Sequence, residues 1–90
     1  GMLRLPRGAV RRLVGHGRDA VVRPAPTELE LLHAEAAPLV MRDALARVPL
    51  PLGPPALIAL GAREAAALPL RQTVHVLAFL GRAVAAALSR

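Results

Sequence analysis

The sequence predicts a small α+β domain: an antiparallel sheet with helices packed on one side, in the order α-β-α-β-β-α. Two apolar runs at residues 44–50 and 56–60, joined by a proline-rich loop, are typical of a β-hairpin. Apolar residues at helical spacing over residues 69–88 predict one long closing helix. The chain of 90 residues is long enough for one small domain with a marginal core. We take residues 2–90 as that domain, since Gly1 before Met2 looks like a tag remnant.

The net charge of +6 comes from twelve arginines and no lysine, against six acids. Tyr, Trp and Asn are also absent, a bias that a GC-rich genome explains more simply than selection for guanidinium chemistry. There is no cysteine, so disulfides and thiolate metal sites are excluded. The apolar stretches end well before the roughly 20 residues needed to cross a bilayer, and no signal peptide is recognisable. We therefore expect a soluble, cytoplasmic protein without a membrane partner.

Residues 2–14 predict a short helix that begins near Pro6 and is stopped by Gly15 and Gly17. Its arginines suit a phosphate-binding or membrane-surface patch, although charge runs are more often a solvated helix face. The Gly-His-Gly at residues 15–17 is too short for a phosphate-cradling loop. The basic residues of this end are Arg4, Arg7, Arg11, Arg12 and Arg18.

Residues 19–23 predict a short strand, which Pro24 and Pro26 end. Thr27 followed by Glu30 is typical of a capping box, so we expect a helix over residues 27–37. Pro38 ends or kinks this helix.

The first hairpin run alternates, as on a strand with one wet face. The second run is apolar throughout, which suits a strand covered on both faces or a buried helical turn; its shortness and flanking Pro and Gly favour the strand. The loop prolines cannot donate ladder hydrogen bonds. One face of the first run carries Ala44, Ala46, Val48 and Leu50, and the other carries Leu45 and Arg47.

On the closing helix the apolar arc covers more than half of the circumference, which is wider than one sheet face needs. The surplus suggests a second helix alongside, and in so small a protein that helix can come from another copy. We therefore expect a homodimer. Its predicted interface residues are Val76, Phe79, Leu80, Ala83 and Val84.

No stretch carries a catalytic or metal-binding pattern. The three histidines lie far apart in the chain, and none forms an i, i+4 pair or a zinc motif. The hydroxyl groups are few, and none has the setting of an activated nucleophile. We expect Asp43, Arg63 and Glu64 to form salt bridges at strand ends. The sequence thus predicts a protein that is not an enzyme and has no metal or cofactor.

Two phrases carry a family resemblance: LIALGARE at residues 57–64 and LAFLGRAV at residues 77–84. Together with GRDAVVR at residues 17–23 and APLVMRDALAR at residues 37–47, they resemble the GAF-like bacterial proteins called domain-of-unknown-function family 484. The resemblance implies a GAF-like fold, which is widely used to sense small molecules and to dimerise through helices. The loop before the last helix departs from the family phrase and keeps only its glutamine, Gln72.

The leading hypothesis is a non-enzymatic GAF-like regulatory or interaction module that self-associates through its last helix. A small-molecule ligand would lie between the hairpin and the helix at residues 27–37, with Arg47 or Arg63 as its polar anchor. The alternative is a basic accessory protein that binds nucleic acid through Arg4, Arg7, Arg11 and Arg12.

Overall fold

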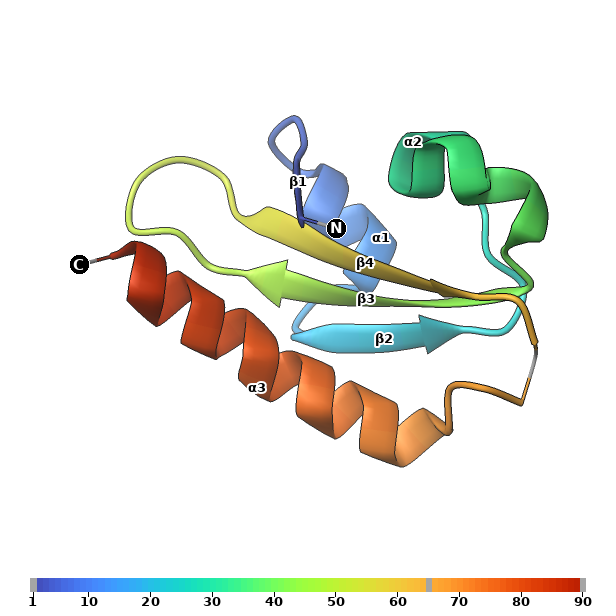
Figure 1. Ribbon diagram of the computed structural model, residues 1–90. Helices are drawn as coiled ribbons and strands as arrows, with labels where there is room; N and C mark the ends of the chain where they lie inside the picture. The colour runs from blue at the N-terminus through green and yellow to red at the C-terminus, as the bar shows by residue number, and fades with distance from the viewer. Residues whose placement is uncertain (1, 65, 90) are drawn as a thin grey trace.

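The computed structural model describes residues 2–64 and 66–89. At its centre is a four-stranded antiparallel sheet in the order β1-β4-β3-β2 (Figure 1). The predicted α+β class with a small antiparallel sheet is confirmed. In chain order the elements are β1 (Met2–Arg4), α1 (Ala9–Val14), β2 (Ala20–Arg23), α2 (Leu29–His33), the 3₁₀ helix η1 (Ala34–Leu39), β3 (Arg42–Val48), β4 (Ala56–Ala62) and α3 (Leu70–Leu88).

The predicted hairpin forms the middle of the sheet. β3 and β4 pair in register from Arg42 opposite Ala62 to Val48 opposite Ala56, so the second apolar run is a strand. β3 ends before Pro49, which has no amide hydrogen to donate. In the connecting loop Gly53 has φ of 81°, a conformation that side chains disfavour.

Helices cover both faces of the sheet, which corrects the prediction that they pack on one side. Ala44 and Ala46 of β3 pack with Leu77 of α3. Leu45, on the opposite face of the same strand, is fully buried in a second core that also contains Val10. In Figure 1, α1 and α2 lie above the sheet and α3 lies below it. The face of β3 predicted to be wet is thus dry at Leu45, because the apolar side of α1 packs there.

The helix predicted over residues 2–14 is wrong in its first part. Residues 2–4 form the edge strand β1, with Leu3 opposite Leu57 of β4, and the helix begins only at Ala9. Between them the chain turns at Gly8, which has φ of 89°. The edge of β4 offers ladder hydrogen bonds to residues 2–4, and this pairing overrides the weak local preference for helix. The element order therefore begins with an additional strand.

The predicted helix at residues 27–37 divides into α2 and η1. The capping box does not form: Glu28 is the residue before the helix, and no side chain caps it. Ala34 then has φ of 48°, which interrupts the helix, and Pro38 lies inside η1. Pro38 lacks the amide that a continuous α-helix needs, so the segment finishes as a tighter 3₁₀ turn.

Candidate functional site

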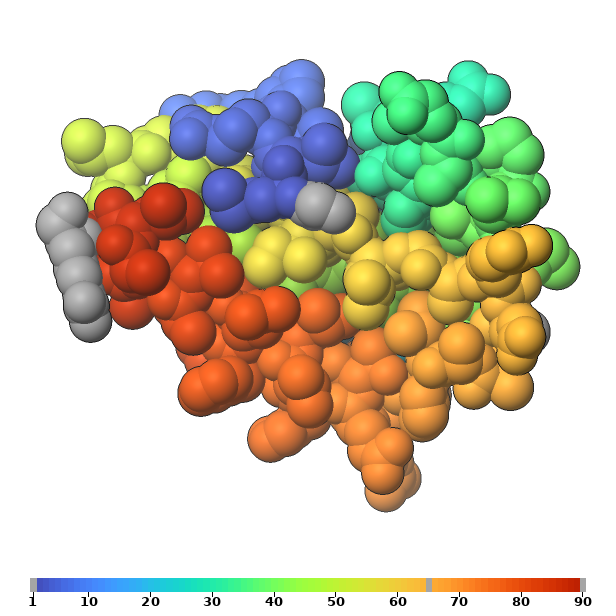
Figure 2. Space-filling model, in the orientation of Figure 1, coloured from blue at the N-terminus to red at the C-terminus, as the bar shows by residue number. Residues whose placement is uncertain are grey.

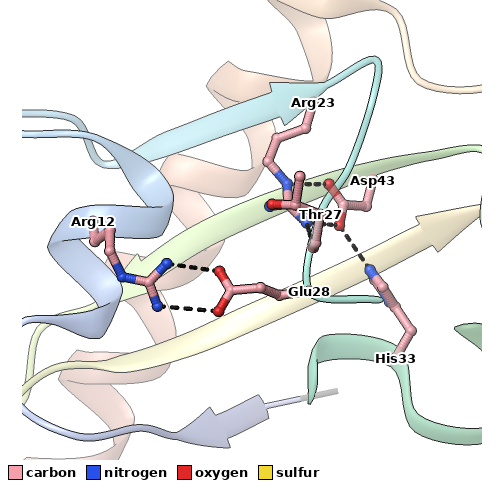
Figure 3. Close-up of polar contacts among 6 residues, drawn as sticks. All are labelled: Arg12, Arg23, Thr27, Glu28, His33 and Asp43. Atoms are coloured by element: carbon pink, nitrogen blue, oxygen red, sulfur yellow. Dashed lines mark hydrogen bonds and ion pairs between the residues drawn. The ribbon is translucent and has the colours of Figure 1, made fainter. Parts of the chain in front are cut away.

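A fully buried carboxylate, that of Asp43, lies near the start of β3. Asp43 accepts a hydrogen bond from Nε of Arg23 on β2 at 2.7 Å, and a second Arg23 nitrogen also bonds this carboxylate. Its Oδ2 lies 2.8 Å from Nε2 of His33 on α2. Figure 3 shows Arg23 and His33 approaching Asp43 from two different elements. Both partners are themselves largely buried.

This cluster holds the chain between β2 and α2 in place. Arg23 also donates to the carbonyl oxygen of Thr27 at 3.0 Å and contacts the Thr27 hydroxyl oxygen at 3.3 Å, so the residue predicted to cap a helix is an acceptor for an arginine. A buried charge is tolerated when it is paired and hydrogen-bonded, and both conditions hold for Asp43. The salt bridge predicted for Asp43 thus exists, but with Arg23 and His33. Arg63 and Glu64, predicted to form similar pairs, make no ion pair with other described residues.

A second, exposed ion pair joins α1 to the residue before α2 (Figure 3). Arg12 donates from Nη1 to Oε2 of Glu28 at 2.7 Å and from Nη2 to Oε1 at 3.2 Å. The hydrogen bonds from Arg12 hold the pKa of Glu28 below its ordinary value and raise that of Arg12. Arg12 is therefore engaged within the fold.

A basic hollow of about 550 Å³ lies between α1, the turn after it and the hairpin loop. Arg47 projects into this region, because its partner across the ladder, Leu57, belongs to the core under α1 and antiparallel partners share a face. The apolar residues on its wall that are accessible include Pro6, Pro54 and Pro55. The basic side chains that line it are Arg7, Arg11, His16, Arg18 and Arg47.

The four arginines predicted to bind nucleic acid are not brought together. Arg7 and Arg11 line the basic hollow, whereas Arg12 is paired with Glu28. Arg4 lies opposite Ala56, which packs against Ala85 of α3, so Arg4 projects from the other face of the sheet.

The ligand was expected between the hairpin and the helix at residues 27–37, and a second hollow, separate from the basic one, lies there. A depression of about 570 Å³ lies between β4 and the α2–η1 segment and is lined by Leu32, His33, Val40, Leu60 and Arg63 among others. Arg63 and Arg47 do not share a site, because they lie at opposite ends of the hairpin. A third hollow, of about 640 Å³, lies along the edge where α3 packs on β2, and two of the residues that line it, Arg82 and Asp19, form an ion pair at 3.4 Å.

The outer side of α3 is apolar and exposed. Val76 is 60% exposed, Phe79 65% and Leu80 42%, and Ala83 is exposed beside them. Val84, the fifth residue predicted for an interface, is half-buried against the core around Val48.

The apolar surface continues from α3 onto the sheet. α3 packs on β3 and β2, and it leaves β4 and β1 largely uncovered on the same face. Met2 is 49% and Leu60 46% exposed there, with Ile58 half-buried between them. Figure 2 shows β4, in yellow, open to solvent between β1, in blue, and α3, in orange and red. We call this surface the open face; it consists of Met2, Ile58, Leu60, Val76, Phe79, Leu80 and Ala83.

The chain matches no protein-family model, and it is not significantly similar to any curated protein or solved structure. The resemblance to the GAF-like family therefore stays a prediction. In the described part of the chain, no helix has the length and apolarity required to cross a membrane. Nor do three or more His, Asp or Glu side chains of these residues gather as metal ligands.

Sequence reasoning missed two groupings. It grouped Arg18 with Arg7 and Arg11 as one basic end but did not join Arg47 to them, because the hairpin returns Arg47 to α1 only in three dimensions. It also missed the contact of Asp43 with His33. The available signal was the position of Asp43 directly before an apolar run, where a carboxylate needs a partner once it is buried.

Proposed function

We propose that the protein is a non-enzymatic interaction module that forms a homodimer through the open face. The observation that carries this proposal is the uncovered half of the sheet beside the exposed side of α3. In keeping with the family resemblance, we propose a GAF-like regulatory role in the bacterial cytoplasm.

The width of the sheet leaves room for a second helix beside α3. Strands lie about 4.8 Å apart, so four of them span roughly 19 Å, whereas one helix with its side chains is about 10 Å wide. One helix thus covers two strands, as α3 covers β3 and β2, and room for a second helix remains over β4 and β1. A two-fold axis beside α3 would place the α3 of each copy on the uncovered strands of the other.

The residues at this surface favour such packing. Ala83 and Ala87 are small and exposed, which allows a second backbone to approach closely. The basic residues of α3, Arg71, His75 and Arg82, lie on the opposite edge of the helix, against β2. No charged side chain of α3 is therefore buried when two copies meet. Arg4 projects from this face of β1, and its long side chain can keep the guanidinium in water while its stem packs against the second copy. An exposed apolar patch of this kind is typical of an interaction site.

The test compares two neighbouring exposed residues of α3 that receive the same charge. Val76→Glu places a carboxylate in the open face, and His75→Glu places one on the basic edge. Sedimentation at micromolar concentrations is expected to give a dimer for the wild type and for His75→Glu. Val76→Glu is expected to weaken association by more than about tenfold, or about 1.4 kcal/mol, because the carboxylate loses water without gaining a partner. A wild type that sediments only as a monomer would refute the proposal, as would equal effects of the two variants.

A second candidate function is binding of nucleic acid through Arg4, Arg7, Arg11 and Arg12. The observation in its favour is the basic surface around Arg7 and Arg11. It predicts retention on duplex DNA at low salt that falls steeply with ionic strength and is lost when the four residues are changed together. Absence of retention at low salt would exclude it.

A further inference from the structure

The basic hollow beside α1 collects positive charge that the fold does not neutralise. Arg7, Arg18 and Arg47 make no side-chain hydrogen bond or ion pair with other described residues. No carboxylate is among the described residues that line the hollow. The nearest acid in sequence, Asp19, lines the β2–α3 hollow, which Arg18 also borders, and its carboxylate pairs with Arg82 and not with Arg18.

Arg11 is the fourth arginine that lines the basic hollow, and His16 holds its side chain. Nε of Arg11 donates a hydrogen bond to Nδ1 of His16 at 2.7 Å, so the imidazole accepts at this atom and fixes the guanidinium. Nη1 of Arg11 has no partner among the described residues. His16 thus acts as a positioning residue for Arg11, and the glycines on both sides of it allow the turn that returns it to α1.

Arg47 is held rigidly at the base of this region. Its backbone amide donates to the carbonyl oxygen of Asp19 at 2.8 Å, and its carbonyl lies against Gly81 of α3. The strand therefore fixes the starting point of the side chain, while the guanidinium stays exposed. Guanidinium groups carry paired N–H donors that match the oxygens of a phosphate.

We propose that this hollow binds the phosphate dianion of a small phosphomonoester. Four arginines line one hollow in which the described residues supply no anion, and a group with two charges on three terminal oxygens can accept hydrogen bonds from more than one of them. The volume of about 550 Å³ suits one small molecule. The apolar wall formed by Pro6, Pro54 and Pro55 would take the organic part of the ligand. This site is separate from the open face, so it does not depend on the dimer.

The same features disfavour nucleic acid as the occupant. Proteins that bind single strands interleave basic groups with aromatic side chains, and no Phe, Tyr or Trp lines the hollow. A duplex needs a track of phosphate contacts, whereas Arg12 is paired and Arg4 projects from the other face. The hollow thus offers one concave site for an anion and not a track of phosphate contacts.

The experiment is calorimetric titration at low ionic strength with n-butyl phosphate, inorganic phosphate and dimethyl phosphate. Butyl phosphate is expected to bind one molecule per chain and more tightly than inorganic phosphate, because its alkyl group contacts the apolar wall. Dimethyl phosphate carries one charge, as a nucleic-acid linkage does, and is expected to bind at least about tenfold more weakly. Equal affinity for butyl and dimethyl phosphate would overturn the proposal, and equal affinity for inorganic phosphate would overturn the role of the apolar wall.

Three variants that each remove one positive charge locate the site. Arg47→Gln and Arg18→Gln are each expected to weaken butyl phosphate binding by about tenfold or more, since each removes a charged donor. Arg63→Gln, at the far end of the hairpin, is expected to leave the affinity within about twofold, because Arg63 does not line the basic hollow and cannot donate to a phosphate bound there. All three side chains are exposed, so thermal unfolding should be unchanged and is measured in parallel. Equal losses in all three variants would mean non-specific charge attraction and would overturn the site.

Discussion

Replacing Gly81 with alanine is expected to destabilise the protein, although alanine is the better helix former. In an exposed helix interior this change stabilises by about 1 kcal/mol. At Gly81 the new Cβ would overlap the carbonyl oxygen of Arg47 and lie 3.3 Å from its carbonyl carbon. Both atoms are backbone, so they cannot move aside as the end of a flexible side chain would.

The magnitude follows from how the clash is relieved. α3 must move away from β3 by roughly 1 Å to restore an ordinary carbon–oxygen contact of about 3.3 Å. This movement loosens Leu77 and Ala85, which lie buried one turn to either side of Gly81. Overpacking of this kind costs about 1–3 kcal/mol, so we expect a net loss of up to about 2 kcal/mol once the gain of about 1 kcal/mol in helix propensity is subtracted. For a chain of this size a loss of about 2 kcal/mol lowers Tm by roughly 8–16 °C.

The assay is urea unfolding followed by circular dichroism, at several protein concentrations so that association is separated from folding. Ala86→Gly, at an exposed position of the same helix, serves as the control. It is expected to cost only the intrinsic difference of about 1 kcal/mol. A Gly81→Ala variant more stable than the wild type would refute the close packing of α3 on β3.

Two further predictions concern the polar contacts. Asp43→Asn removes the negative charge from the buried cluster and leaves Arg23 without its counter-charge. We expect it to lower the free energy of unfolding by about 3 kcal/mol. The control is Asp19→Asn, in the exposed pair with Arg82, which should lower it by less than about 1 kcal/mol. Similar losses in urea unfolding of the two variants would contradict this contrast. Hydrogen bonds from Arg12 lower the pKa of Glu28 in the folded protein. The pair therefore stabilises the fold fully above pH 4.5, the ordinary pKa of the carboxyl. This stabilisation disappears as the pH falls through the lower pKa of the folded state. The Glu28→Gln variant should therefore lose less stability than the wild type between neutral and acidic pH, and an unchanged pH profile would count against the pair.

The hairpin and the closing helix were predictable because their patterns are local. Alternation, proline positions and helical spacing are set by neighbours in the chain, and tertiary contacts reinforced them here. The helix expected at residues 2–14 shows the opposite case. Its first residues join β4 as a strand, and this pairing depends on an edge formed by residues more than fifty positions later.

The predicted interface residues could be named from the sequence because apolar surplus is visible on a helical wheel. Val84 shows the limit of that method, since a wheel does not say which part of the arc the sheet covers. The basic hollow was beyond sequence reasoning for a related reason. Arg12 and Arg18 look alike in the sequence, yet one is paired with Glu28 and the other lines the hollow.

By itself, the sequence determined the α+β class, the hairpin, the long closing helix and its apolar excess, because periodicity and proline chemistry act over a few residues. Only the tertiary structure decided that helices cover both faces, that Asp43 is buried with Arg23 and His33, and which arginines line the basic hollow. Those features arise from side chains that meet across strands distant in the chain, where burial and pairing, and not local preference, set the free energy.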